Sequence, residues 1–80
     1  MDSMNIINKL SPLFRDTFDD QSIIISRNTV ASDINQWDSL NNIRLMVSIE
    51  ELFGITFDTS ELSGLANVGE LVDTIKAKLD

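Results

Sequence analysis

A short polar turn and the apolar-patterned stretch after it constrain this fold most: Trp37-Asp38-Ser39-Leu40 and residues 41–53. Asp38 suits an N-cap, because a short carboxylate can accept the free amide protons in the first turn of a helix. Ser39 then takes the first helical position. That end of a helix carries a partial positive charge and unpaired donors, so a phosphate attached to Ser39 is favoured there.

The helical period divides the helix predicted over residues 39–53 into two faces. One face is an ordinary core stripe, made of Asn42, Leu45, Met46, Ile49, Leu52 and Phe53. The opposite face carries apolar residues bordered by charges: Leu40, Ile43 and Val47, with Arg44, Glu50 and Glu51. A helix with one buried stripe should be polar on its far side, so we interpret the second face as a docking surface for a partner. Scattered exposed apolar residues are the plainer alternative.

A first helix is predicted over residues Ser3 to Thr17. Its apolar residues keep an approximate helical spacing: Ile6, Ile7, Leu10, Leu13 and Phe14. Pro12 interrupts the pattern, because proline removes a backbone donor and can begin a helix after Ser11 as N-cap. We therefore expect this helix to be kinked or broken at Pro12.

Residues 18–37 are predicted to form a long connection, because they are rich in Ser, Thr, Asn and Asp. Ile23-Ile24-Ile25 has no second β-branched run to pair with, so we expect an extended segment laid over the helices rather than a strand. The expected apolar anchors of this loop are Ile23, Ile25, Val30 and Ile34. Trp37 is expected to cover the bundle beside Ser39.

Two further helices are predicted after residue 53, where Gly54 suits a C-cap. Asp58 or Thr59 can cap a short one that runs through Leu62 and ends by Gly64. Asn67 and Glu70 form a start resembling a capping box for the last helix, which has helical spacing at Val68, Leu71, Val72, Ile75 and Leu79. The expected fold is all-α: a single domain over residues 1–80, built as a small four-helix bundle of three main helices and one short helix, with a long first loop.

The amino-acid composition excludes several classes of function. The 80 residues, 42% of them hydrophobic, can bury one small core, and they include no cysteine and no histidine. Thiolate nucleophiles, imidazole bases and zinc sites are therefore absent, so we expect neither an enzyme nor a metal site. No signal peptide or membrane-spanning segment is indicated, and a soluble, cytoplasmic, monomeric protein is the simplest expectation.

The net charge of −7 is unevenly distributed. Residues 31–73 hold eight acids and one base, Arg44, whereas the rest of the chain holds five of each. Such a field disfavours nucleic acid and anionic membranes, and it favours encounter with basic patches on partner proteins. An acidic surface that only aids solubility is the alternative.

The Asp38-Ser39-Leu40 motif and the apolar helix after it, which ends in Glu50-Glu51-Leu52-Phe53, resemble the signature of acyl carrier proteins. The resemblance extends through Phe53-Gly54-Ile55 and the helix around Val68-Gly69-Glu70. It implies that Ser39 carries a 4'-phosphopantetheine arm, installed by a phosphopantetheinyl transferase from coenzyme A with Mg²⁺. It also implies partner enzymes that load, condense or modify acyl groups and that dock through basic patches on the helix after Ser39. The residues recognised there would be Asp38, Leu40, Ile43, Val47, Glu50 and Glu51.

Two alternatives stay open at this stage. Carriers of aminoacyl or peptidyl groups resemble this chain too, but their motif typically has glycines before the serine, where this chain has Gln36-Trp37-Asp38. An unmodified helical adaptor would use Ser39 only as a cap. The Trp-Asp-Ser-Leu form resembles free-standing carriers of specialised or polyketide-type pathways more than the fatty acid carrier.

Overall fold

A computed structural model describes residues 2–34, 37–58, 60–61 and 66–79, except for the side chain of Ser39. Its elements in order are α1 (Ser3–Thr17), the 3-10 turn η1 (Ala31–Asp33), α2 (Ser39–Phe53) and α4 (Val68–Leu79). The described ranges contain no strand, and the all-α prediction is confirmed. The predicted short helix begins after Asp58, with Ser60 and Glu61 helical. Thr59 and residues 62–65, which include its predicted end, lie outside the described residues.

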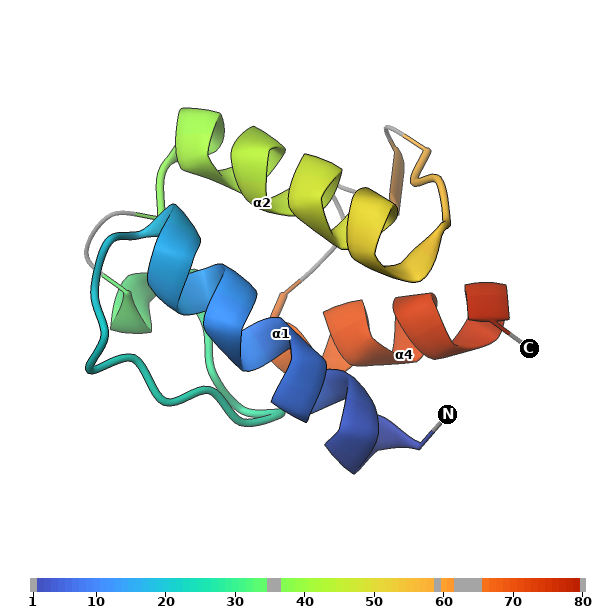
Figure 1. Cartoon of the computed structure of the whole chain (residues 1–80), viewed down its shortest axis with the longest axis horizontal. Coiled ribbons are helices and arrows are strands. Elements are labelled where there is room, and N and C mark those ends of the chain that lie inside the picture. The colour runs from blue at the N-terminus through green and yellow to red at the C-terminus, as the bar shows by residue number, and fades with distance from the viewer. Residues whose placement is uncertain (1, 35–36, 59, 62–65, 80) are drawn as a thin grey trace.

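Helix α1 packs against both α2 and α4 (Figure 1). It begins at Asp2, whose carboxylate accepts the amide proton of Asn5 at 2.9 Å. It buries one face, formed by Ile6, Leu10 and Phe14, as the periodicity predicts.

The expectation of a broken first helix is wrong, because α1 is continuous through Pro12. Pro12 is exposed, and so is Asn8, whose carbonyl loses its helical partner to the proline. Water can satisfy that carbonyl, and a continuous helix keeps buried residues on both sides of Pro12 in one core. Ser11 does not restart a helix, since its hydroxyl donates back to the carbonyl of Ile7 at 3.0 Å. A kink stays a prediction.

The loop between α1 and α2 lies over the helices, as predicted. Ile23, Ile25 and Ile34 are buried in the core, whereas Val30 is only half-buried. Ile24, between two anchors, is 85% exposed. Side-chain alternation in an extended segment therefore anchors the loop and leaves every second residue in solvent.

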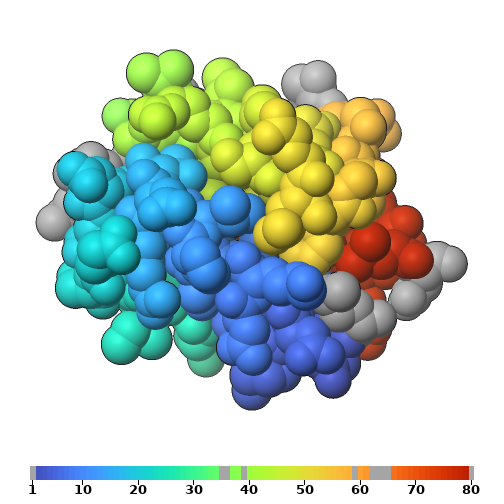
Figure 2. Space-filling model, in the orientation of Figure 1, coloured from blue at the N-terminus to red at the C-terminus, as the bar shows by residue number. Residues whose placement is uncertain are grey.

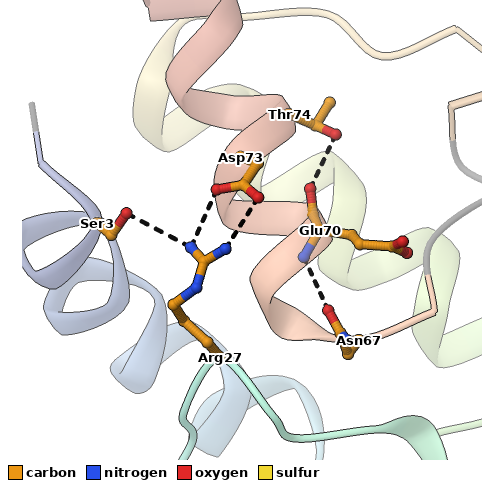
Figure 3. Close-up of polar contacts among 6 residues, drawn as sticks. All are labelled: Ser3, Arg27, Asn67, Glu70, Asp73 and Thr74. Carbon is orange, nitrogen blue, oxygen red and sulfur yellow. Dashed lines mark hydrogen bonds and ion pairs between the residues drawn. The ribbon is translucent and has the colours of Figure 1, made fainter.

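The same loop closes over the start of α4. Val68 donates its amide proton to the carbonyl of Thr29 at 2.9 Å, and Gly69 donates to that of Arg27 at 2.8 Å. Glycine is required there, because a Cβ atom at position 69 would lie 2.9 Å from the Arg27 carbonyl oxygen. The Arg27 guanidinium also forms two bonds to the Asp73 carboxylate, at 3.0 and 2.9 Å (Figure 3). Loop and helix are thus joined by backbone and side chain together.

The core is one cluster enclosed by the three main helices and the loop. Helix α2 contributes Leu45, Met46 and Ile49, and α4 contributes Val68, Leu71, Val72 and Ile75. Phe14 and Phe18 fill the end of the core nearest the start of α2, with ring centroids 5.9 Å apart. Both rings contact Trp37, which lies two residues before α2.

Candidate functional site

Helix α2 begins as the sequence predicts. Asp38 has extended backbone angles, and its Oδ1 accepts the amide proton of Asn41 at 2.9 Å while its carbonyl accepts that of Asn42 at 2.9 Å. Asp38 is therefore the N-cap, and Ser39 is the first residue with a helical backbone. The side chain of Ser39 lies outside the described part of the chain.

This helix end suits a phosphate group. The amide protons of Ser39 and Leu40 have no acceptor within the helix, because the first turn of any α-helix lacks one. The helix dipole adds a partial positive charge at the same place. The residues on either side of Ser39 are exposed, Leu40 by 66%. The backbone here thus presents donors and positive potential at a position that a modifying enzyme can reach.

Trp37 fixes how the chain enters the site. Its ring lies edge-on to Phe14, with centroids 5.4 Å apart, and tilted against Phe18 at 5.7 Å. Its indole N–H donates to Oδ1 of Asn42 at 2.9 Å, which ties the entering chain to the first turn of α2. The prediction that Trp37 covers the bundle beside Ser39 is confirmed. Asn42, predicted as part of the core stripe, instead serves as a half-buried acceptor.

The second face of α2 is exposed as predicted. Leu40, Ile43 and Val47 are 66%, 57% and 47% exposed. They follow one another along the helix, and α2 forms an outer edge of the molecule in Figure 2. We call Leu40, Ile43 and Val47 the apolar face. Leu52 was expected in the core but is 46% exposed, because it falls at the edge of the buried stripe in the last turn.

Glu50 has a structural contact that the sequence did not reveal. Its Oε2 accepts the amide proton of Phe57 at 2.8 Å, and its carbonyl accepts those of Gly54 and Ile55 at 2.8 and 3.2 Å. Gly54 has a left-handed backbone with φ of 66°, which confirms it as the C-cap. Glu50 therefore holds the connection after α2, whereas Glu51 is exposed.

A second acidic contact orders the start of the short helix. Glu61 accepts the amide proton of Asp58 at 2.8 Å and pairs with Lys78 of α4 at 2.8 Å. Both bonds lower the pKa of Glu61, and the bond from the Asp58 backbone has the larger effect. The described residues contain no cluster of acids that could hold a metal ion, and within the same ranges no helix is long and apolar enough to cross a membrane.

Comparisons with known proteins agree with this geometry. Residues 37–75 match the family described as phosphopantetheine attachment site. A solved structure of holo acyl carrier protein from Geobacter metallireducens is similar, with 46% identity and a TM-score of 0.85 over 91% of this chain and 84% of that one. The acyl carrier protein of Coprothermobacter proteolyticus is 29% identical over 99% of this chain and 96% of its own.

The chain belongs to the acyl carrier protein family. It is a carrier rather than a catalyst, and its prosthetic group is a covalently attached phosphopantetheine. As a carrier it interacts with a phosphopantetheinyl transferase and with biosynthetic enzymes.

Proposed function

We propose that Ser39 carries the 4'-phosphopantetheine arm, and that the apolar face of α2 presents the arm to partner enzymes. The observation that carries this proposal is the start of α2: Asp38 caps the helix, and Ser39 is its first residue, inside the segment that matches the attachment-site family.

The other serines in residues 37–75 are in positions less suitable for attaching a phosphate. Ser48 lies in the middle of α2, where the surrounding amide protons are used by the helix. Ser60 lies in a helical stretch of which only two residues are described. Ser63 lies outside the described residues. Among the described serines of that segment, only Ser39 combines the first position of a long helix with a side-chain cap on the preceding residue. Ser3 follows the cap Asp2 at the start of α1 in the same way, but it lies outside the segment that matches the attachment-site family.

Each residue around Ser39 has its own part in this function. Asp38 fixes the helix start, so the Ser39 hydroxyl is offered at a constant place on the surface. The free amide protons of Ser39 and Leu40 can donate to the phosphate that joins the arm to the chain. Trp37 and Asn42 hold the entering chain against the core. When attached, the arm supplies the thiol on which an acyl group is held as a thioester, since the chain has no cysteine.

The apolar face would be covered when a partner docks. Burying exposed apolar area is favourable, and Leu40 is the neighbour of Ser39, so docking there brings the partner to the arm. The exposed acids Asp38 and Glu51 at the two ends of this face favour partners with basic patches. Glu50 would add negative charge beside the face while its carboxylate holds Phe57.

We further propose that the pathway is fatty acid, polyketide or related specialised biosynthesis. The Trp37-Asp38-Ser39-Leu40 form supports a specialised, polyketide-type carrier within that range. Intact mass of the protein recovered from its native host would identify the cargo. A polyketide-type acyl group would support this choice, whereas a simple fatty acyl chain or an amino acid would contradict it.

The attachment site is tested by incubating the purified protein with coenzyme A, Mg²⁺ and a broad-specificity phosphopantetheinyl transferase. Wild type and the control Ser48→Ala should gain the mass of one arm, and Ser39→Ala should gain none while keeping its helical circular dichroism. An arm on Ser39→Ala, or none on wild type, would contradict the proposal.

The docking face is tested by the rate of the same reaction. Val47→Glu and Glu51→Lys should slow arm transfer and leave the unfolding midpoint nearly unchanged, because both side chains are exposed. Rates equal to wild type would remove the docking role. Glu50→Lys is a poorer test, since it also breaks the bond to Phe57.

A further inference from the structure

Arg44 is an isolated cation within the docking surface. It is the only base in residues 31–73, it is exposed, and it lies one turn after Leu40 in the middle of the apolar face. A single opposite charge at the centre of an acidic region must affect which partner surface fits there.

The chain does not neutralise Arg44 within its own helix. Ion pairs on a helix surface form at spacings of three or four residues, and these positions around Arg44 are Leu40, Asn41, Val47 and Ser48, none of them acidic. In the described residues the ion pairs join Arg27 to Asp73 and Lys78 to Glu61. One guanidinium N–H donates to Oδ1 of Asn41 at 3.3 Å, and that bond occupies one of its five donors.

The nearest acid on the same side of α2 is Glu51. Seven residues are about two turns, so Glu51 lies roughly 10.5 Å further along the helix at nearly the same angle. Asp38 lies before the first turn. The docking surface therefore presents negative, positive and negative charge in sequence along its length, beside the apolar residues.

We propose that Arg44 selects the partner: the enzyme that loads the acyl group presents a carboxylate opposite Arg44, a basic residue opposite Glu51 and an apolar groove between them. This inference rests on the proposed function of Ser39 and the apolar face. A uniformly basic patch would place a cation against Arg44, and such like-charge contacts disfavour a wrong partner strongly. The guanidinium suits a bidentate carboxylate, which fixes register as well as sign. The loading enzyme is the partner for which this matters most, since it decides which acyl group this carrier receives.

The experiment uses tagged chains expressed in the native host and recovered for intact mass, which reports the fraction with an arm and the fraction of arms that carry an acyl group. The informative variants are Arg44→Glu, Arg44→Lys and the exchange Arg44→Glu with Glu51→Arg. The exchange leaves net charge and composition unchanged, so it separates the order of charges from their sum.

We expect Arg44→Glu and Arg44→Lys to carry the arm, whereas the exchange, which reverses the charge of Glu51, should gain it more slowly, so acylation is counted per arm present. The acylated fraction should fall by about ten-fold or more in Arg44→Glu and in the exchange, and should change by less than about three-fold in Arg44→Lys, which keeps the charge. Equal acylation in wild type, Arg44→Glu and the exchange, with arms attached, would overturn the role of Arg44. Increased acylation of Arg44→Glu would also overturn it, in favour of a uniformly basic partner. Wild type recovered without an arm would overturn the proposed function and this inference with it.

Discussion

Helices α2 and α4 begin with the same local chemistry. Asp38 caps α2 by accepting from Asn41, and Asn67 caps α4 by accepting from Glu70, each at 2.9 Å. The short polar cap accepts from the third helical residue in both cases, and each helix buries one face in the same core. Judged by capping alone, either N-terminus could receive a phosphate.

The two ends differ in what lies over them. At α4 the next amide protons, those of Val68 and Gly69, already donate to carbonyls of the first loop, and Arg27 reaches past them to Asp73 (Figure 3). At α2 the entering chain is held aside by Trp37, and Leu40 remains 66% exposed. If Ser39 carries the arm as we propose, the difference between these two ends is that the loop takes up the first donors of α4 and leaves the start of α2 exposed.

Gly69→Val should have the largest effect on stability and should open the covered end. The added Cβ would meet the Arg27 carbonyl at 2.9 Å, and backbone cannot yield as a flexible side chain does. We expect a loss of about 2 kcal/mol in the free energy of unfolding, within the usual cost of overpacking. Urea denaturation followed by circular dichroism measures it.

Ala77→Val is the matched control for Gly69→Val, because Ala77 is exposed on the same helix and reports only the cost of a β-branched residue there. Folded Gly69→Val should still accept the arm at the wild-type rate. A stability equal to that of the control would show that the loop does not press on α4.

Removing the two caps should cost similar stability and differ in function. Asp38→Ala and Asn67→Ala should each lower the free energy of unfolding by about 1 kcal/mol, the typical worth of an N-cap. Arm transfer should slow only in Asp38→Ala, since only that cap positions Ser39. Rates are compared at a temperature where both variants are folded. Equal slowing in both would mean that general stability, rather than the α2 start, governs the reaction.

Much of this comparison follows from sequence, because caps and helix faces depend on residues within a few positions of one another. Asp38, Gly54 and Asn67 are placed correctly by that reasoning, as is the exposure of Leu40, Ile43 and Val47. Local pattern also identifies the serine that we propose for the arm.

Contacts between distant segments could not be predicted in the same way. The loop carbonyls that cover α4 lie about forty residues before it, and nothing near residue 27 indicates that contact. Gly69 was the available signal, since glycine weakens a helix and often marks a close backbone approach. Pro12 misled because the carbonyl that loses its donor lies on the exposed side of the helix, where water can take the donor's place. The bond from Phe57 to Glu50 could not be predicted, since it depends on the fold of the connection after α2.

The ion pair between Arg27 and Asp73 should contribute least to the free energy of unfolding, because both side chains are exposed. The hydrogen bonds from Arg27, and then its charge, lower the pKa of Asp73. An aspartate whose pKa falls on folding adds stability above its unfolded value, about 3.9, and loses it as pH drops through the folded value. Arg27→Ala should therefore destabilise the protein slightly at pH 7 in dilute buffer. The difference from wild type should shrink in about 1 M salt, where the Debye length is about 3 Å, and disappear below the folded pKa of Asp73.

Arg27→Ala also separates the two ways in which the loop covers α4, because the substitution keeps the backbone carbonyl that accepts from Gly69. Melting curves of wild type, Arg27→Ala, Asp73→Ala and the double variant at both salt concentrations give the coupling between the side chains. A loss in Arg27→Ala as large as that in Gly69→Val, and insensitive to salt, would mean that the guanidinium closes this helix end. A small, salt-dependent loss of stability would assign the closure to the backbone bonds from Val68 and Gly69 to the loop. The described start of α2, where Leu40 is exposed, has no such cover.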